Sequence, residues 1–130
     1  MTLPLERIAW MPSPPLVPDI GSIDLEHLNR MTLGDLSLER EVLSIFSTQS
    51  ARLLGQIVGL PDDVAALVHT LKGSARAIGA FAVAEAAENV ESALANGTDP
   101  ADAIAELSHA VALARTAIDL MLSRSRSDDL

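Results

Sequence analysis

Apolar residues recur along most of the chain at the three- and four-residue spacing of an amphipathic α-helix, and no segment alternates like a half-buried strand. The pattern predicts a short helix over 24–31 and four longer helices over 35–58, 62–78, 82–95 and 100–122. Short connections between such helices favour antiparallel neighbours. We therefore expect an all-α fold, an antiparallel up-down-up-down four-helix bundle with a short extra helix.

Residues that suit helix ends separate the periodic segments. They are Asp24, Asp35 and either Thr98 or Asp99 as N-caps, Gly59, Gly79 and Gly97 as C-terminal stops, and Pro61 and Pro100 as first-turn residues. The apolar positions on one face of each long helix, such as Phe46, Leu71, Val90 and Leu107, form the candidate core.

The 130 residues have room for one domain with one core. Five of the seven prolines fall within residues 1–19, which we interpret as a Pro-rich N-terminal arm, extended over 11–19 and with at most a weak helix over 5–10. The bundle domain is predicted over 20–123, and a polar, frayed tail over 124–130.

Composition removes several functional classes. Aromatic residues make up only 2% of the chain, which argues against an all-β fold. The net charge of −9 argues against nucleic acid or an anionic membrane surface as partner. There is no cysteine, no signal peptide pattern and no apolar run long enough to span a membrane, so we expect a cytoplasmic protein.

Familiar catalytic and metal-binding patterns do not occur in the sequence. It contains no nucleophile elbow, P-loop or dinucleotide-binding glycine motif, and its three histidines lack the spacing of metal ligands on one helix. The acidic residues Glu85, Glu88 and Glu91 are interpreted as a solvated helix face, and His27 and His109 as ordinary polar positions.

His69 stands apart because of its position on the third long helix. At about 100° per residue it points roughly 150° away from the centre of the apolar stripe, toward solvent. Lys72, Gly73 and Arg76 follow at three, four and seven residues, so they share its side, and Lys72 is the only lysine of the chain. A glycine inside a helix costs about 1 kcal/mol relative to alanine, so Gly73 indicates a need for space beside the imidazole.

This cluster suits a transient phosphoryl carrier. A neutral imidazole nitrogen is a good nucleophile, and a nearby ammonium offsets the charge of the arriving phosphoryl oxygens. The alternative, an exposed histidine beside two ordinary surface cations and a tolerated glycine, is equally compatible with the spacing alone.

The segment His69-Thr-Leu-Lys-Gly-Ser-Ala-Arg-Ala-Ile-Gly-Ala80 resembles the motif of the histidine phosphotransfer (HPt) domain family, in which His-x-x-Lys-Gly is followed after five residues by another glycine. Here these residues are His69, Lys72, Gly73 and Gly79. The upstream stretches Ile23–Leu28, Leu33–Leu36 and Glu41–Phe46 are also similar to bacterial members. The resemblance covers about residues 22–122.

The resemblance implies a role for each matching residue. His69 would accept the phosphoryl group, Lys72 would steady it and Gly73 would keep access open. The remaining positions are supporting ones: Ser74 near the imidazole, Glu91 where members carry Glu or Gln near the histidine, Gln49 approaching from the neighbouring helix, and Gly79 in the motif. Arg76 lies outside the motif, and its expected role is either in docking a partner or as simple surface charge.

The implied function is a phosphotransfer intermediate that relays phosphoryl groups between receiver-domain aspartates, without ATP binding or autokinase activity. Its implied partners are response-regulator receiver domains and a hybrid histidine kinase. No cofactor is expected in this chain, since the Mg²⁺ belongs to the receiver, and a complete bundle needs no second copy, so we expect a monomer. Two alternatives stay open: an HPt-like interaction module that transfers nothing, and the dimerisation and phosphoacceptor bundle of a sensor kinase. Thr70 after His69, and no proline before Pro100, disfavour the sensor kinase.

Overall fold

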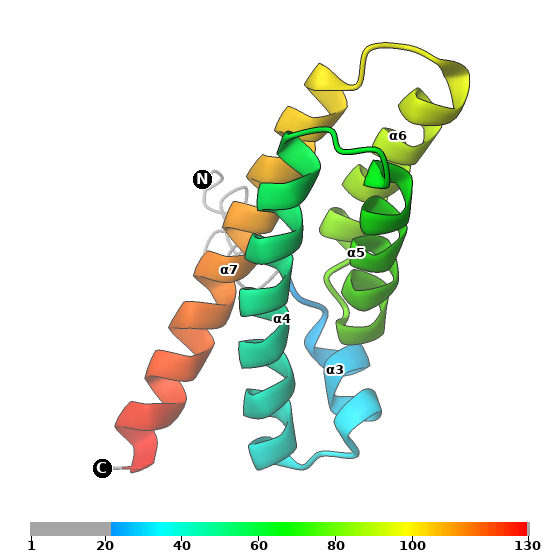
Figure 1. The fold of residues 1–130 in the computed structure, drawn as a ribbon. Coiled ribbons are helices and arrows are strands. Elements are labelled where there is room, and N and C mark those ends of the chain that lie inside the picture. The colour runs from blue at the N-terminus through cyan, green and yellow to red at the C-terminus, as the bar shows by residue number, and fades with distance from the viewer. Residues whose placement is uncertain (1–21, 130) are drawn as a thin grey trace, which may run out of the picture.

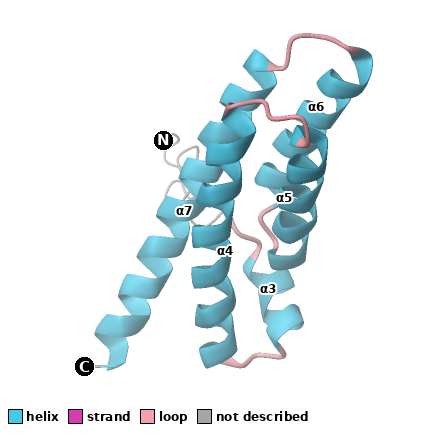
Figure 2. Ribbon diagram, viewed as in Figure 1, coloured by secondary structure: helices cyan, strands magenta, loops and turns pink. Residues whose placement is uncertain are grey.

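The computed structural model describes residues 22–129, with side chains described over 22–124. This part of the chain forms five helices and no strand (Figures 1 and 2). The helices are α3 (Leu25–Thr32), α4 (Leu36–Val58), α5 (Val64–Ile78), α6 (Phe81–Asn96) and α7 (Ala101–Asp129). The all-α prediction is confirmed. The predicted arm over 1–19 lies outside the described residues.

The four long helices pack as a bundle in which each contacts two neighbours. The contacts join α4 to α5, α5 to α6, α6 to α7, and α7 back to α4. Short connections at 59–63, 79–80 and 97–100 reverse the chain direction each time, so neighbouring helices are antiparallel. The short helix α3 contacts α4 and α5, and it continues the line of α5 beyond that helix's C-terminal end (Figure 1).

The helix ends lie close to their predicted places, because capping residues determine them locally. The carboxylates of Asp24 and Asp35 accept hydrogen bonds from the backbone N–H groups of His27 and Leu38, each at 3.1 Å. Gly97 ends α6 in the left-handed conformation, with φ of 71°. One detail differs: α5 begins at Val64 after a turn, so Pro61 lies in that turn and not in the helix.

The last helix is longer than predicted. It continues through Asp129, where the sequence predicts an end near Leu122 and a frayed tail over 124–130. The expected end is wrong because it relied on the loss of apolar periodicity, whereas no glycine or proline follows Pro100 to stop the helix. The C-terminal part of α7 diverges from α4 (Figure 1).

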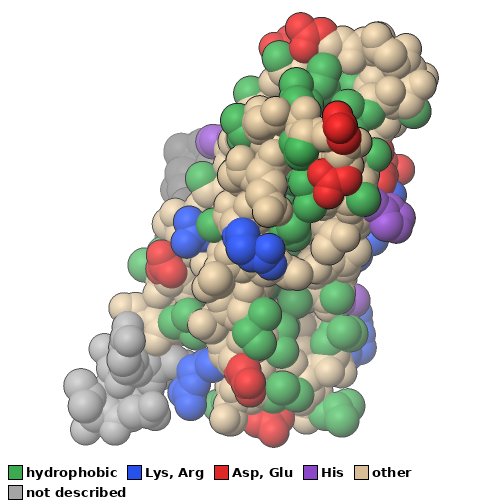
Figure 3. Space-filling view, in the orientation of Figure 1, with side chains coloured by type: hydrophobic (Ala, Val, Ile, Leu, Met, Phe, Trp, Pro, Cys, Tyr) green, Lys and Arg blue, Asp and Glu red, His purple; other side chains and the backbone are tan. Residues whose placement is uncertain are grey.

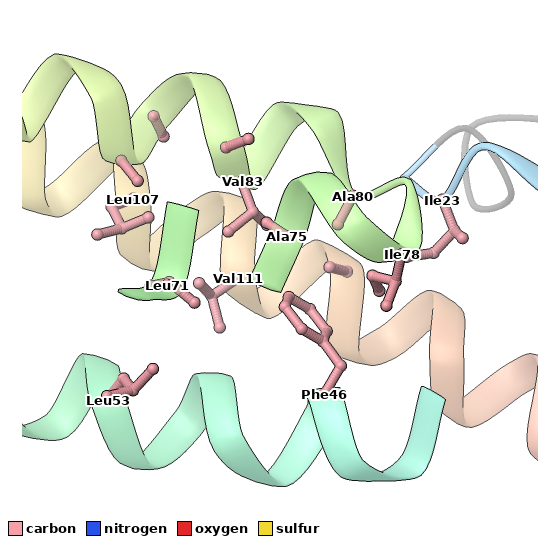
Figure 4. Close-up of a cluster of buried hydrophobic side chains, with 14 of the residues drawn as sticks. Ile23, Phe46, Leu53, Leu71, Ala75, Ile78, Ala80, Val83, Leu107 and Val111 are labelled. Carbon is pink, nitrogen blue, oxygen red and sulfur yellow. The ribbon is translucent and has the colours of Figure 1, made fainter. Parts of the chain in front are cut away.

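The core lies along the axis of the bundle and draws apolar side chains from every helix. Figure 4 shows Phe46 of α4 pointing into the interior, where side chains of α5, α6 and α7 meet. The candidate core residues Phe46, Leu71, Val90 and Leu107 are all buried, as predicted. On α6 the buried residues are all small, which allows the neighbouring helices to approach closely: Val83, Ala84, Ala86, Ala87 and Val90.

The junction of α3 with the end of α5 depends on Gly79. Its φ is 89°, and a Cβ built on it would lie 2.9 Å from the backbone oxygen of Asp24. In return, the N–H of Asp24 donates a 2.9 Å hydrogen bond to the carbonyl of Gly79. The two backbones meet so closely that only glycine fits here.

The surface carries charges of both signs together with exposed apolar side chains. On the face formed by α4 and α7, acidic and basic side chains are scattered among apolar ones without a large patch of one sign (Figure 3). Within residues 22–129, none of the helices combines the length and the apolar character that crossing a membrane requires.

Candidate functional site

The exposed side of α5 carries His69. The opposite side of this helix buries Val68, Leu71, Ala75 and Ile78, and this stripe fixes the rotation of the helix. The side chain of His69 is therefore directed outward and is 73% exposed, as its spacing predicts. Figure 3 shows histidine side chains at the edge of the molecule formed by α3 and α5.

Glu91 of α6 reaches His69 across the seam between the two helices. Its carboxylate Oε2 lies 3.1 Å from the imidazole Nδ1, and its Oε1 accepts a 2.6 Å hydrogen bond from the Lys72 ammonium. The close packing of small residues on α6 makes this bridge possible. One carboxylate thus contacts both candidate side chains of α5.

The bridge determines which imidazole nitrogen carries the proton. The Lys72 ammonium at 2.6 Å holds the pKa of Glu91 below its ordinary value, and the His69 hydrogen bond adds to the lowering while burial opposes it. The carboxylate is therefore ionised and accepts only, so Nδ1 must carry the proton that it donates. In the neutral ring, Nε2 then has the lone pair of a nucleophile.

Lys72 and Gly73 complete the surroundings of the imidazole. The Lys72 side chain is only 14% exposed, since its stem packs along the helix seam while its ammonium meets Glu91. A Cβ built on Gly73 would meet nothing within 4 Å, so packing does not require glycine there. The open space lies one helical turn from His69, on the same side. Ser74 is half-buried beside it.

A second ion pair continues the seam one turn further along both helices. Arg76 of α5 lies 3.5 Å from Glu88 of α6, and both side chains are about half exposed, at 53% and 56%.

Gln49, the supporting residue predicted on α4, is half-buried and lines a shallow depression with other α4 residues, including Thr48 and Arg52. No hydrogen bond among the described residues links Gln49 to His69.

The interhelical pairings were beyond reasoning from the residues alone. The sequence pattern of Glu88 and Glu91 indicates a solvated face, and only the resemblance places Glu91 near His69. The single usable signal is their three-residue spacing opposite Lys72 and Arg76, which becomes meaningful once the two helices are known to be antiparallel neighbours.

His27 is also more than a surface position: its Nε2 lies 3.1 Å from the Ala77 carbonyl oxygen, and its ring meets Phe81 edge to face.

Comparison with known families gives one match. The family model of the Hpt domain matches residues 41–128, which is more than half of the chain. The chain belongs to the Hpt domain family. The matched region contains α5, α6 and each residue of the site. No match was found among curated proteins or solved structures.

Membership identifies the Hpt domain as a histidine phosphotransfer module of phosphorelays. Hpt domains work without a bound cofactor, and within residues 22–124, whose side chains are described, no group could hold a metal ion.

Proposed function

We propose that this Hpt domain relays phosphoryl groups between the aspartates of receiver domains by forming phospho-His69. The observation that carries the proposal is the bridge from Glu91, which leaves Nε2 unprotonated in an imidazole side chain that is 73% exposed. Nothing else in the described structure combines a free nucleophile, a neighbouring cation and open access in this way.

The transfer step follows from this geometry. Nε2 attacks the phosphorus of a receiver's aspartyl phosphate, the new P–N bond forms, and the aspartate oxygen leaves with the electrons of the old P–O bond. The Nδ1–H remains hydrogen-bonded to Glu91, whose negative charge balances the charge that the ring acquires. Lys72, one turn away, offsets the added phosphoryl charge. The reverse transfer uses the same contacts in the opposite order.

The partners proposed are receiver domains of response regulators and a hybrid histidine kinase that supplies the phosphoryl group. We propose that the domain acts in the cytoplasm as a monomer, because its four long helices already enclose one core. Any metal ion needed for transfer would bind in the receiver domain.

The proposal is tested by labelling the full chain with a phosphorylated receiver domain or with phosphoramidate, a small donor that phosphorylates histidine. We expect an acid-labile label on the parent chain and none on His69→Gln. His109→Gln is the matched control, because His109 is exposed on a different helix, and it should be labelled like the parent. His69→Gln should melt like the parent, since the side chain is 73% exposed. An unlabelled parent, or a labelled His69→Gln, would contradict the proposal.

A further inference from the structure

The candidate site contains two cationic side chains, Lys72 and Arg76, which differ in exposure and in the closeness of their ion pairs. Lys72 is nearly enclosed and bound to Glu91 at 2.6 Å, so its charge is committed to the reacting group. Arg76 is 53% exposed, and its contact with Glu88, at 3.5 Å, is at the outer limit of a hydrogen bond. Arg76 is therefore a cation on this side of α5 that another molecule can reach.

The charges around Arg76 make its position important for a partner. The chain has a net charge of −9, and α6 contributes Glu85, Glu88 and Glu91 but no lysine or arginine. An acceptor aspartate and its phosphoryl group are anionic as well. An approaching partner therefore meets repulsion from α6, and a local positive group is needed to offset it.

Arg76 is placed to meet the rim of a partner and not its reacting centre. It follows His69 by seven residues, which is two turns and about 10 Å along the helix. A standard interface covers about 800 Å² of each partner, so a domain that closes over His69 also covers Arg76. A charge at such a rim changes the rate of association and its salt dependence more than the chemical step.

Building on the proposed function, we propose that Arg76 is the docking contact for an acidic group at the rim of the receiver, and that Glu88 competes with the receiver for it. Glu88 binds Arg76 in the free protein and yields it on docking. The loose Arg76–Glu88 pair then sets the affinity for the partner, while Lys72 and Glu91 serve the transfer itself.

The test measures transfer from a phosphorylated receiver domain to the full chain as a function of receiver concentration. Arg76→Gln should lower kcat/KM about three- to tenfold at low salt through a higher KM, with kcat unchanged. Arg76→Lys should recover part of the loss. Arg124→Gln is the charge-matched control on α7, and it should act like the parent. In 1 M salt, where charges are screened beyond about 3 Å, the Arg76 effect should disappear.

Glu88→Gln tests the competition. It should raise kcat/KM about two- to fivefold, the range of an exposed ion pair. Glu85→Gln removes the same charge from the same helix, but Glu85 forms no ion pair within the described residues, so its effect should be smaller. When Arg76→Gln is also present, Glu88→Gln and Glu85→Gln should change kcat/KM by the same factor.

Three results would overturn the inference: an unchanged KM in Arg76→Gln, a loss confined to kcat, or equal effects of Glu88→Gln and Glu85→Gln in the parent background. The proposed function is tested separately by phosphoramidate, which needs no docking. All these variants should be labelled on His69 at the parent rate, and an unlabelled parent would contradict the function and not the docking contact.

Discussion

The two glycines of the His69 motif, six residues apart, serve opposite purposes in this structure. Gly73 lies in the middle of α5 with helical backbone, and a side chain there would meet only solvent. Gly79 lies at the end of the same helix in the left-handed conformation, and a side chain there would collide with the backbone of Asp24. Gly73 is dispensable for the fold, whereas Gly79 is required by it.

The comparison separates two regions of one helix. In the middle of α5, packing does not require glycine, and we expect Gly73 to keep space around the His69 ring at the expense of helix stability. The end of α5 gains stability from contacts that fix α3 and the start of α6. Within one sequence motif, the structure therefore separates a glycine that packing requires from one that it does not.

The largest expected effect is on stability at Gly79. Gly79→Ala should lower the free energy of unfolding by about 2–4 kcal/mol, from left-handed strain of about 1–2 kcal/mol plus the overpacking against Asp24. Gly97→Ala is the control, because Gly97 also has positive φ but open space around it, and it should lose only the strain. Urea unfolding measures both. Equal losses in the two variants would show that the contact with Asp24 contributes nothing.

The next effect is on transfer at Gly73. Gly73→Gln should be as stable as the parent or more so, since glycine costs about 1 kcal/mol in a helix, while phosphotransfer from a receiver falls at least tenfold because the side chain obstructs the imidazole. Gly73→Ala should gain the same stability with a smaller loss of transfer. Thermal melting and transfer rates on one preparation decide between the outcomes. A normal rate in Gly73→Gln would remove the steric role.

The smallest effect concerns the acid limit of stability at Glu91. The pKa of Glu91 is lowered from its ordinary value of 4.5 in the folded state. Ionised Glu91 therefore stabilises the fold at pH values above that ordinary pKa, and this contribution is lost as the pH falls through the folded-state pKa. Glu91→Gln should remove about 1 kcal/mol or less of this pH-dependent part. Urea unfolding between about pH 6 and pH 3 compares the two proteins. Parallel stability curves would show that Glu91 makes no such contribution.

Much of the fold could be predicted because its signals are local. Asp24 and Asp35 cap the helices that they precede, and Gly97 ends α6, since each acts on the backbone within a few residues of itself. The end of α7 was missed because stopping a helix requires a positive signal, and polar residues alone do not supply one. The left-handed turn at Gly79 was expected only as a stop, because its contact with Asp24 joins positions far apart in sequence.

The candidate site likewise has features that one helix determines and contacts that depend on two helices. The exposure of His69 and the side shared by Lys72 and Arg76 follow from the turn of one helix, and the structure confirms them. The contacts of Glu91 and Glu88 depend on the register between α5 and α6, which many buried side chains determine together. The transfer roles of His69, Lys72 and Gly73, and the supporting roles of Ser74 and Gln49, stay predictions.

The junction at Gly79 makes the segment before α4 part of the folded core. The family match begins at residue 41, yet Ile23 and Leu28, which precede it, are as deeply buried as any residue of the bundle. A fragment limited to residues 41–128 would lack the buried side chains of Ile23 and Leu28. It would also leave the Gly79 carbonyl without the N–H of Asp24 as its hydrogen-bond donor. The region that the family model matches therefore leaves out residues that belong to the packed core.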